Sequence, residues 1–277
     1  MDQDDVFADL HTHTSASDGV LSPGTLVDRA ADRGIQVLSV TDHDTMEGLA
    51  AATAVAQERD IELLAGVELS VTLDGDEIHL LAYDVDPIHA GLHKHLEALQ
   101  EARRDRAWRI VERLRSCGLE VEDEHLRTDI ATTHAVGRPH LAAALVRGGH
   151  VETHREAFDR YLGRGKPGYV AKPAFPADDA LRLVHEAGGV GVLAHPGHWT
   201  SSTQVRRLVD AGLDGLETHH PSHDASLRSY YERLARGYDL LLTGGSDYHG
   251  RTDDENAHFG TVGMNRSAWE RFRAALA

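Results

Sequence analysis

The segment Asp9-Leu10-His11-Thr12-His13-Thr14 ends an apolar stretch with two closely spaced histidines. We expect residues 6–10 to form a short strand. Extended backbone turns the side chains of residues i and i+2 to the same side, so the imidazoles of His11 and His13 would converge on one point. Neutral imidazole is a common metal ligand, and the pair therefore suggests part of a divalent metal site.

Strands and helices alternate on both sides of a middle region. Ser22-Pro23 predicts a helix start, and Gly34 closes that helix. Residues 35–40 are almost continuously apolar, as in strands buried on both faces of a parallel sheet. The alternation is typical of a parallel sheet wrapped by helices. The expected strands are residues 6–10, 35–40, 61–67, 190–194, 215–218 and 240–243, and further helices are expected at residues 46–60, 177–187, 203–211, 224–236 and 267–277.

The middle region departs from this rhythm. Asp74-Gly75 predicts the turn of a hairpin between residues 69–73 and 77–83. From residue 88 to about residue 173 there is little strand signal, and helices are expected at residues 89–116, 138–147 and 153–162. We therefore expect a barrel domain of residues 1–86 and 174–277, with a helical insertion of residues 87–173 that covers the active site.

Polar side chains with metal-binding groups follow almost every expected strand. In a barrel of parallel strands, functional groups gather at the C-terminal strand ends, so these side chains should meet. The alternative is a set of unrelated histidines at caps and loops. The residues at the expected strand ends are His11, His13, His43, Glu68, His195, His219, His220, Asp247 and His249.

The donor atoms limit which metals could bind. Imidazole and carboxylate fit Zn, Mn or Fe, and the single cysteine, Cys117, excludes a thiolate cluster. These ligands are too many for one ion. A carboxylate such as Glu68 could bridge two ions, as in many phosphatases and nucleases.

These motifs resemble the polymerase-and-histidinol-phosphatase (PHP) family of metal-dependent phosphoesterases. The resemblance covers nearly the whole chain and implies a distorted (β/α)₇ barrel with a trinuclear site, most consistent with Mn²⁺, with Zn²⁺ or Fe²⁺ as alternatives. It assigns one metal to His11, His13, Glu68 and Asp247, a second to Glu68, His79 and His195, and a third to Asp18, His43 and His249. Some members have His in place of Asp18, and the carboxylate should make the third site more suited to Mn²⁺.

Within the family, the order of motifs is most similar to nucleoside 3′,5′-bisphosphate phosphatases that also act as 5′→3′ exoribonucleases on short RNA. The resemblance implies a small phosphorylated substrate. Arg138, which could form a bidentate fork, and Lys166, on a glycine-flanked loop, are candidates for binding its remote phosphate. The predicted catalytic residues are His198, His223 and Asp247, with the two histidines as proton donors to the leaving alcohol. Asp42 is expected to orient an imidazole, with a solvent-exposed or capping role as the alternative.

Composition limits the partners. The net charge of −17 argues against binding duplex DNA, which needs a basic face. It indicates either a protein that stays hydrated in concentrated salt or an ordinary acidic enzyme. No apolar run is long enough for a bilayer and no signal peptide is evident, so we expect a cytoplasmic protein without a membrane partner. The sequence leaves the oligomeric state open.

Three other functions remain open from the sequence. A histidinol-phosphate phosphatase would use the same metals on another monoester. A PHP module without activity could serve as a metal-stabilised scaffold. A C–N hydrolase could also use this site, because a fold does not set its chemistry.

Overall fold

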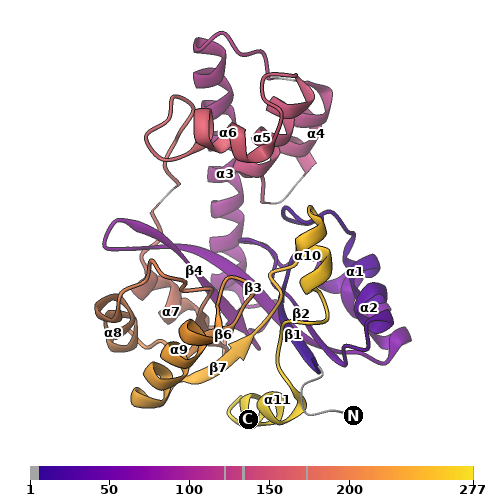
Figure 1. Cartoon of the computed structure of the whole chain (residues 1–277), viewed down its shortest axis with the longest axis vertical. Coiled ribbons are helices and arrows are strands. Elements are labelled where there is room, and N and C mark those ends of the chain that lie inside the picture. The colour runs from indigo at the N-terminus through magenta and orange to yellow at the C-terminus, as the bar shows by residue number, and fades with distance from the viewer. Residues whose placement is uncertain (1–5, 122, 133–134, 173, 277) are drawn as a thin grey trace. The chain divides into compact units, whose positions relative to one another are not determined.

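The computed structural model describes residues 6–121, 123–132, 135–172 and 174–276 (Figure 1). Within these residues the strands form one sheet whose spatial order equals the chain order. Bridges from Ala8 to Met264 and from Thr12 to Tyr248 connect the first strand to the segment after the last, which nearly closes the sheet into a barrel. The strands are β1 (Ala8–Thr12), β2 (Val37–Val40), β3 (Glu62–Leu73), β4 (Asp76–Tyr83), β5 (Val190–Leu193), β6 (Gly215–His219) and β7 (Leu241–Gly244).

The barrel is distorted because its middle strand runs against the others. β4 pairs antiparallel with both β3 and β5, whereas β1–β2–β3 and β5–β6–β7 are parallel. The expected turn lies between β3 and β4, where Asp74 and Gly75 have φ values of 53° and 87°. A two-residue turn with both φ values positive matches the right-handed twist of the flanking strands. The predicted distorted α/β barrel is confirmed.

The sequence indicated that Glu68 lies at a strand end, and this prediction is wrong. It lies in the middle of β3, opposite Leu81 of β4 and in a bridge with His43 beyond the end of β2. The antiparallel partner β4 supplies hydrogen bonds past the point where β2 stops, so β3 continues for 12 residues. Glu68 is therefore held on both sides by paired backbone.

Helices cover the outside of the barrel. In α1, the Ser22 side chain accepts the backbone N–H of Thr25 and Pro23 occupies the first turn, as the sequence predicts. Buried Leu26 and Val27 pack on Leu38 of β2. The barrel helices are α1 (Pro23–Asp32), α2 (Leu49–Arg59), α7 (Ala177–Glu186), α8 (Ser202–Asp210), α9 (Ala225–Gly237), α10 (Asp253–His258) and α11 (Arg266–Ala274), of which only α10 was not expected.

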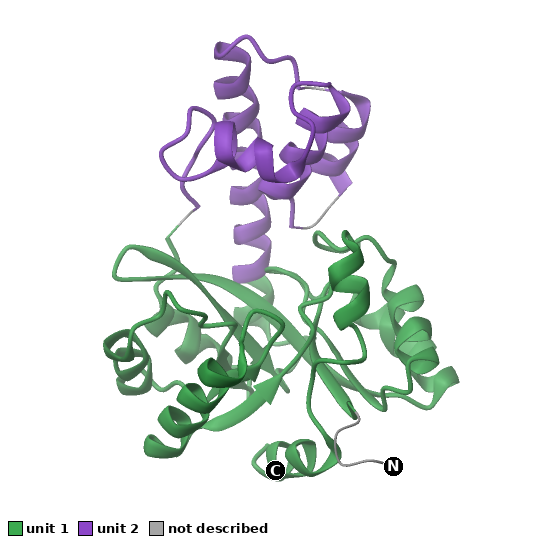
Figure 2. Cartoon of the chain, in the orientation of Figure 1, with its two compact units in different colours: residues 1–94, 174–277 green, residues 95–173 purple. Residues whose placement is uncertain are grey.

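The chain divides into two compact units, residues 1–94 with 174–277 and residues 95–173 (Figure 2). The second unit has its own apolar core, in which Ile110 and Leu114 pack with Leu141 and Leu145. Arg106 donates its Nε–H to the Val170 carbonyl at 2.8 Å and ties the two ends of this unit together. Its elements are most of α3 (Ala90–Ser116), then α4 (Glu124–Thr132), α5 (Arg138–Arg147), α6 (His154–Ala157) and the π-helix η1 (Phe158–Leu162).

No helix among the described residues is both long and apolar enough to cross a membrane. The longest, α3, carries many charged side chains along its length. The acidic residues 1–5 lie outside the described part of the chain.

Candidate metal centre

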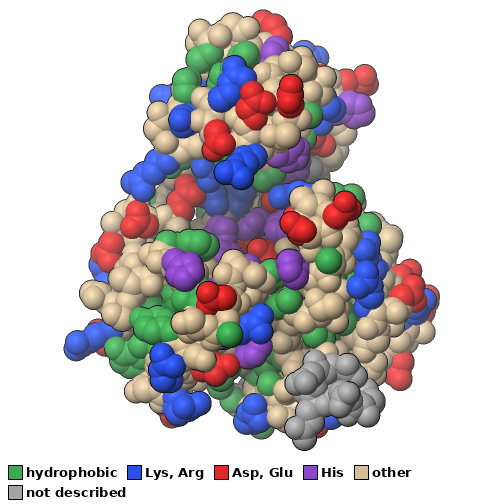
Figure 3. All heavy atoms as spheres, in the orientation of Figure 1, with side chains coloured by type: hydrophobic (Ala, Val, Ile, Leu, Met, Phe, Trp, Pro, Cys, Tyr) green, Lys and Arg blue, Asp and Glu red, His purple; other side chains and the backbone are tan. Residues whose placement is uncertain are grey.

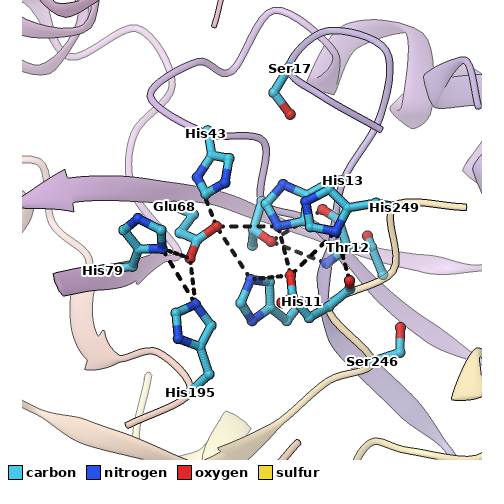
Figure 4. A network of polar contacts seen from close by, with 12 residues as sticks. His11, Thr12, His13, Ser17, His43, Glu68, His79, His195, Ser246 and His249 are labelled. Carbon is cyan, nitrogen blue, oxygen red and sulfur yellow. Dashed lines mark hydrogen bonds and ion pairs between the residues drawn. The ribbon is translucent and has the colours of Figure 1, made fainter. Parts of the chain in front are cut away.

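Glu68 lies at the centre of a cluster of imidazoles in the barrel unit (Figure 4). Its carboxylate is buried, with 1% of the side chain exposed. One oxygen, Oε1, lies 2.7 Å from His79 Nδ1 and 3.1 Å from His195 Nε2. The other, Oε2, faces three more imidazoles, at 3.0 Å from His43 Nδ1, 3.2 Å from His13 Nε2 and 3.4 Å from His11 Nε2.

Asp247 closes the cluster from the segment after β7. Its Oδ1 lies 3.1 Å from His13 Nε2 and 3.3 Å from His11 Nε2. The two histidines of β1 therefore converge on common carboxylates, as their i, i+2 spacing predicts. His249 follows, and its Nδ1 bonds the carbonyl of Asp247 at 2.9 Å.

A third carboxylate, Asp18, lies on the loop after β1 and contacts further histidines. Its Oδ1 lies 3.3 Å from His249 Nε2 and 4.0 Å from His13 Nδ1. The guanidinium of Arg251 contacts its Oδ2 at 2.7 Å and also donates to its carbonyl. The donor atoms of Asp18, His13, His249 and His43 lie within 4.8 Å of one another.

The donor atoms fit divalent cations. Within the described structure, six buried atoms of these side chains have no hydrogen-bond partner, although they lie close to other donors of the cluster. Buried polar atoms of this kind normally find a partner, so their common direction indicates an ion. The atoms are His11 Nε2, His13 Nδ1 and Nε2, Asp18 Oδ1, His43 Nδ1 and Glu68 Oε2.

The geometry forms four overlapping groups. Besides the Asp18 group, one contains His11, Glu68 and His195, one His11, His13 and Asp247, and one His43, Glu68 and His79. All nine predicted ligands are thus brought together, whereas His219 belongs to none of the groups. In the space-filling view, several histidine side chains lie together with acidic ones among them (Figure 3).

Charges in the cluster are strongly coupled. Burial alone would raise the pKa of Glu68, but the imidazoles of His43, His79 and His11 hold it well below its usual range. Burial lowers the pKa of His13, but Asp247 and Glu68 outweigh burial and raise it to about 10. The pKa of His43, in contrast, is lowered by burial, so the imidazoles of the cluster do not all favour the protonated form.

Two of the predicted ligands have strained backbone conformations. His195 has φ of 25° and Asp247 has φ of 51°, values that non-glycine residues rarely adopt. Such strain costs about 1–3 kcal/mol per residue and persists where the surroundings enforce it. At both positions the surroundings are the ends of strands β5 and β7, next to the cluster.

Asp42 shows the capping role that was the alternative. It accepts from the backbone N–H and hydroxyl of Thr14 at 2.7 and 2.6 Å and from the hydroxyl of Ser17 at 2.5 Å. These bonds shape the loop that carries Asp18, so Asp42 acts on that ligand through the backbone.

Of the predicted proton donors, His223 has no ring nitrogen available. Its Nδ1 bonds the Thr218 carbonyl at 3.0 Å, and its Nε2 accepts the Gly197 N–H at 3.1 Å. It is 2% exposed, and burial lowers its pKa. This geometry corrects the expectation that His223 is a general acid, because donating to a substrate would break a backbone bond. His198 is exposed on the loop after β5.

Arg138 and Lys166 belong to the unit of residues 95–173. The Arg138 guanidinium lies over the rings of Phe158 and Tyr169, at 5.8 and 5.6 Å from their centroids. Lys166 is exposed on the turn after η1. Their approach to the substrate stays a prediction.

Of three further residues near the cluster, Glu217 and Arg251 were not anticipated, whereas His220 was among the strand-end candidates. Glu217 on β6 bonds His11, His220 Nε2 lies 3.3 Å from Asp247 Oδ2, and Arg251 holds Asp18. Glu217 had a signal in the sequence, because a carboxylate inside a buried strand needs a partner. His220 was noted only as a strand-end residue.

A family model described as the PHP domain matches residues 9–169, more than half of the chain. The chain belongs to the PHP domain family. A PHP protein from Haemophilus influenzae, named 5′-3′ exoribonuclease, is 35% identical over 87% of this chain and 89% of its own length. The 3′,5′-nucleoside bisphosphate phosphatase of Chromobacterium violaceum is 35% identical over 87% of this chain and 86% of its own.

Solved structures agree with this PHP assignment. A protein from Bifidobacterium adolescentis described as a metal-dependent phosphoesterase superposes with a TM-score of 0.87 at 31% identity, over 96% of this chain and 95% of its own. An amidohydrolase from C. violaceum gives the same TM-score and identity over 97% and 96%. The predicted family and enzyme class, a metal-dependent phosphoesterase, are confirmed.

Proposed function

We propose that this PHP protein removes phosphate from small nucleotides such as nucleoside 3′,5′-bisphosphates, and that it also degrades short RNA from the 5′ end. The observation that carries the proposal is that His11 and His13 both face the carboxylates of Glu68 and Asp247, in a chain similar over most of its length to a bisphosphate phosphatase and an exoribonuclease. Both activities hydrolyse an ester of an anionic phosphate.

We propose two to three divalent cations per chain, with Mn²⁺ favoured over Zn²⁺ and Fe²⁺. The donor set of imidazole and carboxylate without sulfur supports these metals. Bound cations would neutralise phosphate oxygens and lower the pKa of an attacking water. Glu68, Asp247 and Asp18 would contribute carboxylate oxygens to these cations, and Asp18 would make the third position richer in oxygen.

The remaining groups of the chain would bind and protonate the substrate. Arg138 and Lys166 are proposed to hold the phosphate that is not cleaved. His198 is proposed to donate a proton to the leaving alcohol, because it is exposed next to the ligand His195. Trp199 is 69% exposed on the same loop and could stack on a nucleobase.

The test is a metal-by-substrate screen. Protein stripped of metal is reloaded with Mn²⁺, Zn²⁺ or Fe²⁺ in turn and given a nucleoside 3′,5′-bisphosphate, a 5′-phosphorylated RNA oligonucleotide or histidinol phosphate. We expect the highest kcat/KM on the bisphosphate with Mn²⁺. A preference for histidinol phosphate would contradict the proposed substrate, and no phosphate release with any metal would favour the scaffold.

Hydrolysis of C–N bonds is the second candidate, because one structure of similar fold is named an amidohydrolase. A panel of amide substrates in the same screen separates the two. Turnover of an amide without phosphate release would favour the C–N hydrolase function over the phosphoesterase function.

A further inference from the structure

Glu217 forms hydrogen bonds with both of its carboxylate oxygens to residues of the metal centre. It lies on β6 with 0% exposure. Oε1 lies 3.0 Å from His11 Nδ1, at the end of β1, and Oε2 accepts the backbone N–H of His195 at 2.7 Å, at the end of β5. One side chain thus contacts ligands from two strands that are far apart in the sequence.

The first bond determines how His11 presents its ring. With a carboxylate beside it, Nδ1 must carry the proton, which leaves the Nε2 lone pair for another partner. Nε2 lies 3.4 Å from Glu68 and 3.3 Å from Asp247, and it has no hydrogen-bond partner among the described residues. A carboxylate on the far nitrogen also makes the imidazole a stronger donor to a metal.

The second bond holds the backbone of His195. This residue has φ of 25°, and a buried N–H in that conformation needs an acceptor. Glu217 supplies it, and the ring of His195 is turned so that Nε2 lies 3.1 Å from Glu68 Oε1. Without that acceptor, the backbone would relax and move the ring.

We propose that Glu217 is a positioning residue that fixes the tautomer of His11 and the backbone of His195, so that both rings point at the metals. It is not itself a ligand, because both of its oxygens are already bonded to the ligands. The inference rests on the proposed metal centre and is independent of the substrate.

The first experiment compares Glu217→Gln with the wild type by calorimetric titration of Mn²⁺ into metal-free protein. The Gln amide can accept one of the two N–H groups, but its NH₂ would face the other donor. We expect Mn²⁺ affinity to fall about 10–100-fold, as for other outer partners of metal ligands. Glu58→Gln, the same change at an exposed position of α2, should keep wild-type affinity.

Saturating Mn²⁺ should restore kcat of Glu217→Gln to within a few-fold of the wild type, while KM for the substrate stays unchanged. A purely structural role would not be rescued by metal. Wild-type Mn²⁺ affinity in Glu217→Gln would overturn the proposal.

A second measurement does not depend on the variant folding. Nitrogen-15 NMR of Zn²⁺-loaded wild-type protein, labelled at histidine, reports which ring nitrogen of His11 carries the proton. We expect the proton on Nδ1. A proton on Nε2 of His11 would overturn the proposal, whether or not the protein has the proposed phosphatase activity.

Discussion

At the scale of single residues, Glu68 connects most of the cluster. Its two oxygens face imidazoles that come from four different segments of the chain, and hardly any of its surface reaches solvent. If Glu68 were removed, a neighbouring side chain could not move to make all of these contacts. The five histidines are His11, His13, His43, His79 and His195.

Glu68→Gln tests this role. Replacing a residue that belongs to several ligand groups should reduce metal affinity at least as much as replacing an outer partner of a ligand. We therefore expect more than about 100-fold loss of Mn²⁺ affinity and a similar loss of phosphatase activity at limiting metal. Titration calorimetry and phosphate release measure the two effects. Retained affinity would show that Glu68 is not a ligand.

The raised pKa of His13 predicts a pH effect on the metal-free protein. Below its ordinary pKa of 6.5, His13 is protonated in the folded and the unfolded chain, so the stabilisation from Glu68 and Asp247 is fully present. Between 6.5 and about 10 only the folded chain keeps the proton, and stability falls as pH rises. The slope is up to about 1.4 kcal/mol per pH unit.

Urea denaturation in the presence of a chelator, at about pH 6.5, 8 and 9.5, measures this slope. His13→Asn should show a shallower dependence, because it removes the titrating group. Equal slopes in both proteins would assign the effect to another group.

Residue-level prediction succeeded where chemistry and local spacing suffice. The convergence of His11 and His13 follows from strand alternation alone. Glu217 could not be assigned, because no local pattern indicates that the carboxylate of β6 will bond an imidazole of β1. His223 was misjudged for the same reason, since its two backbone partners are set by the fold.

At the scale of elements, the hairpin of β3 and β4 shows the limit of periodicity. The Asp74-Gly75 turn was predicted correctly, because its residue types demand positive φ. The strand before it was divided at Glu68, since a charge in an apolar run resembles a strand end. The pairing of Glu68 with Leu81 keeps the strand continuous, and that pairing depends on the tertiary structure.

The segment after β7 packs tightly on β1. A Cβ at Gly245 would lie 2.4 Å from the Cβ and backbone nitrogen of His11. We expect Gly245→Ala to lower the free energy of unfolding by about 1–3 kcal/mol and to weaken Mn²⁺ binding, because the added methyl displaces a ligand.

Gly237→Ala is the matched control. Nothing lies within 4 Å of a Cβ built at Gly237, the last residue of α9, so its stability should stay unchanged or rise slightly. Urea denaturation compares the two variants. A Gly245→Ala protein as stable as the wild type would mean that β1 and the β7 segment can move apart.

At the scale of the whole molecule, metal should stabilise the folded state. The cluster exists only when β1, β3, β5 and the segment after β7 are assembled, so metal binds the folded chain in preference to the unfolded one. At a concentration 100 times Kd, one site adds about 2.7 kcal/mol. We expect Tm to rise with Mn²⁺ and to return to the lower value with chelator.

Scanning calorimetry with and without Mn²⁺ measures the shift. Mg²⁺ at the same concentration is the control, since it prefers oxygen ligands and should raise Tm less. No change of Tm with Mn²⁺ would contradict a metal centre.

The division into units was partly accessible to sequence reasoning. The helical region was evident because strand patterns stop near residue 88. The compact unit begins at residue 95, since α3 starts within the barrel unit and continues as one helix into the next. Periodicity along a continuous helix carries no mark at such a boundary.

The bridges that join Ala8 to Met264 and Thr12 to Tyr248 have a consequence for biosynthesis. His11 emerges from the ribosome well before Asp247 and His249, which follow β7. The nascent polypeptide therefore cannot complete the cation cage until these late residues have left the exit tunnel. Products of premature termination before Asp247 would lack this site.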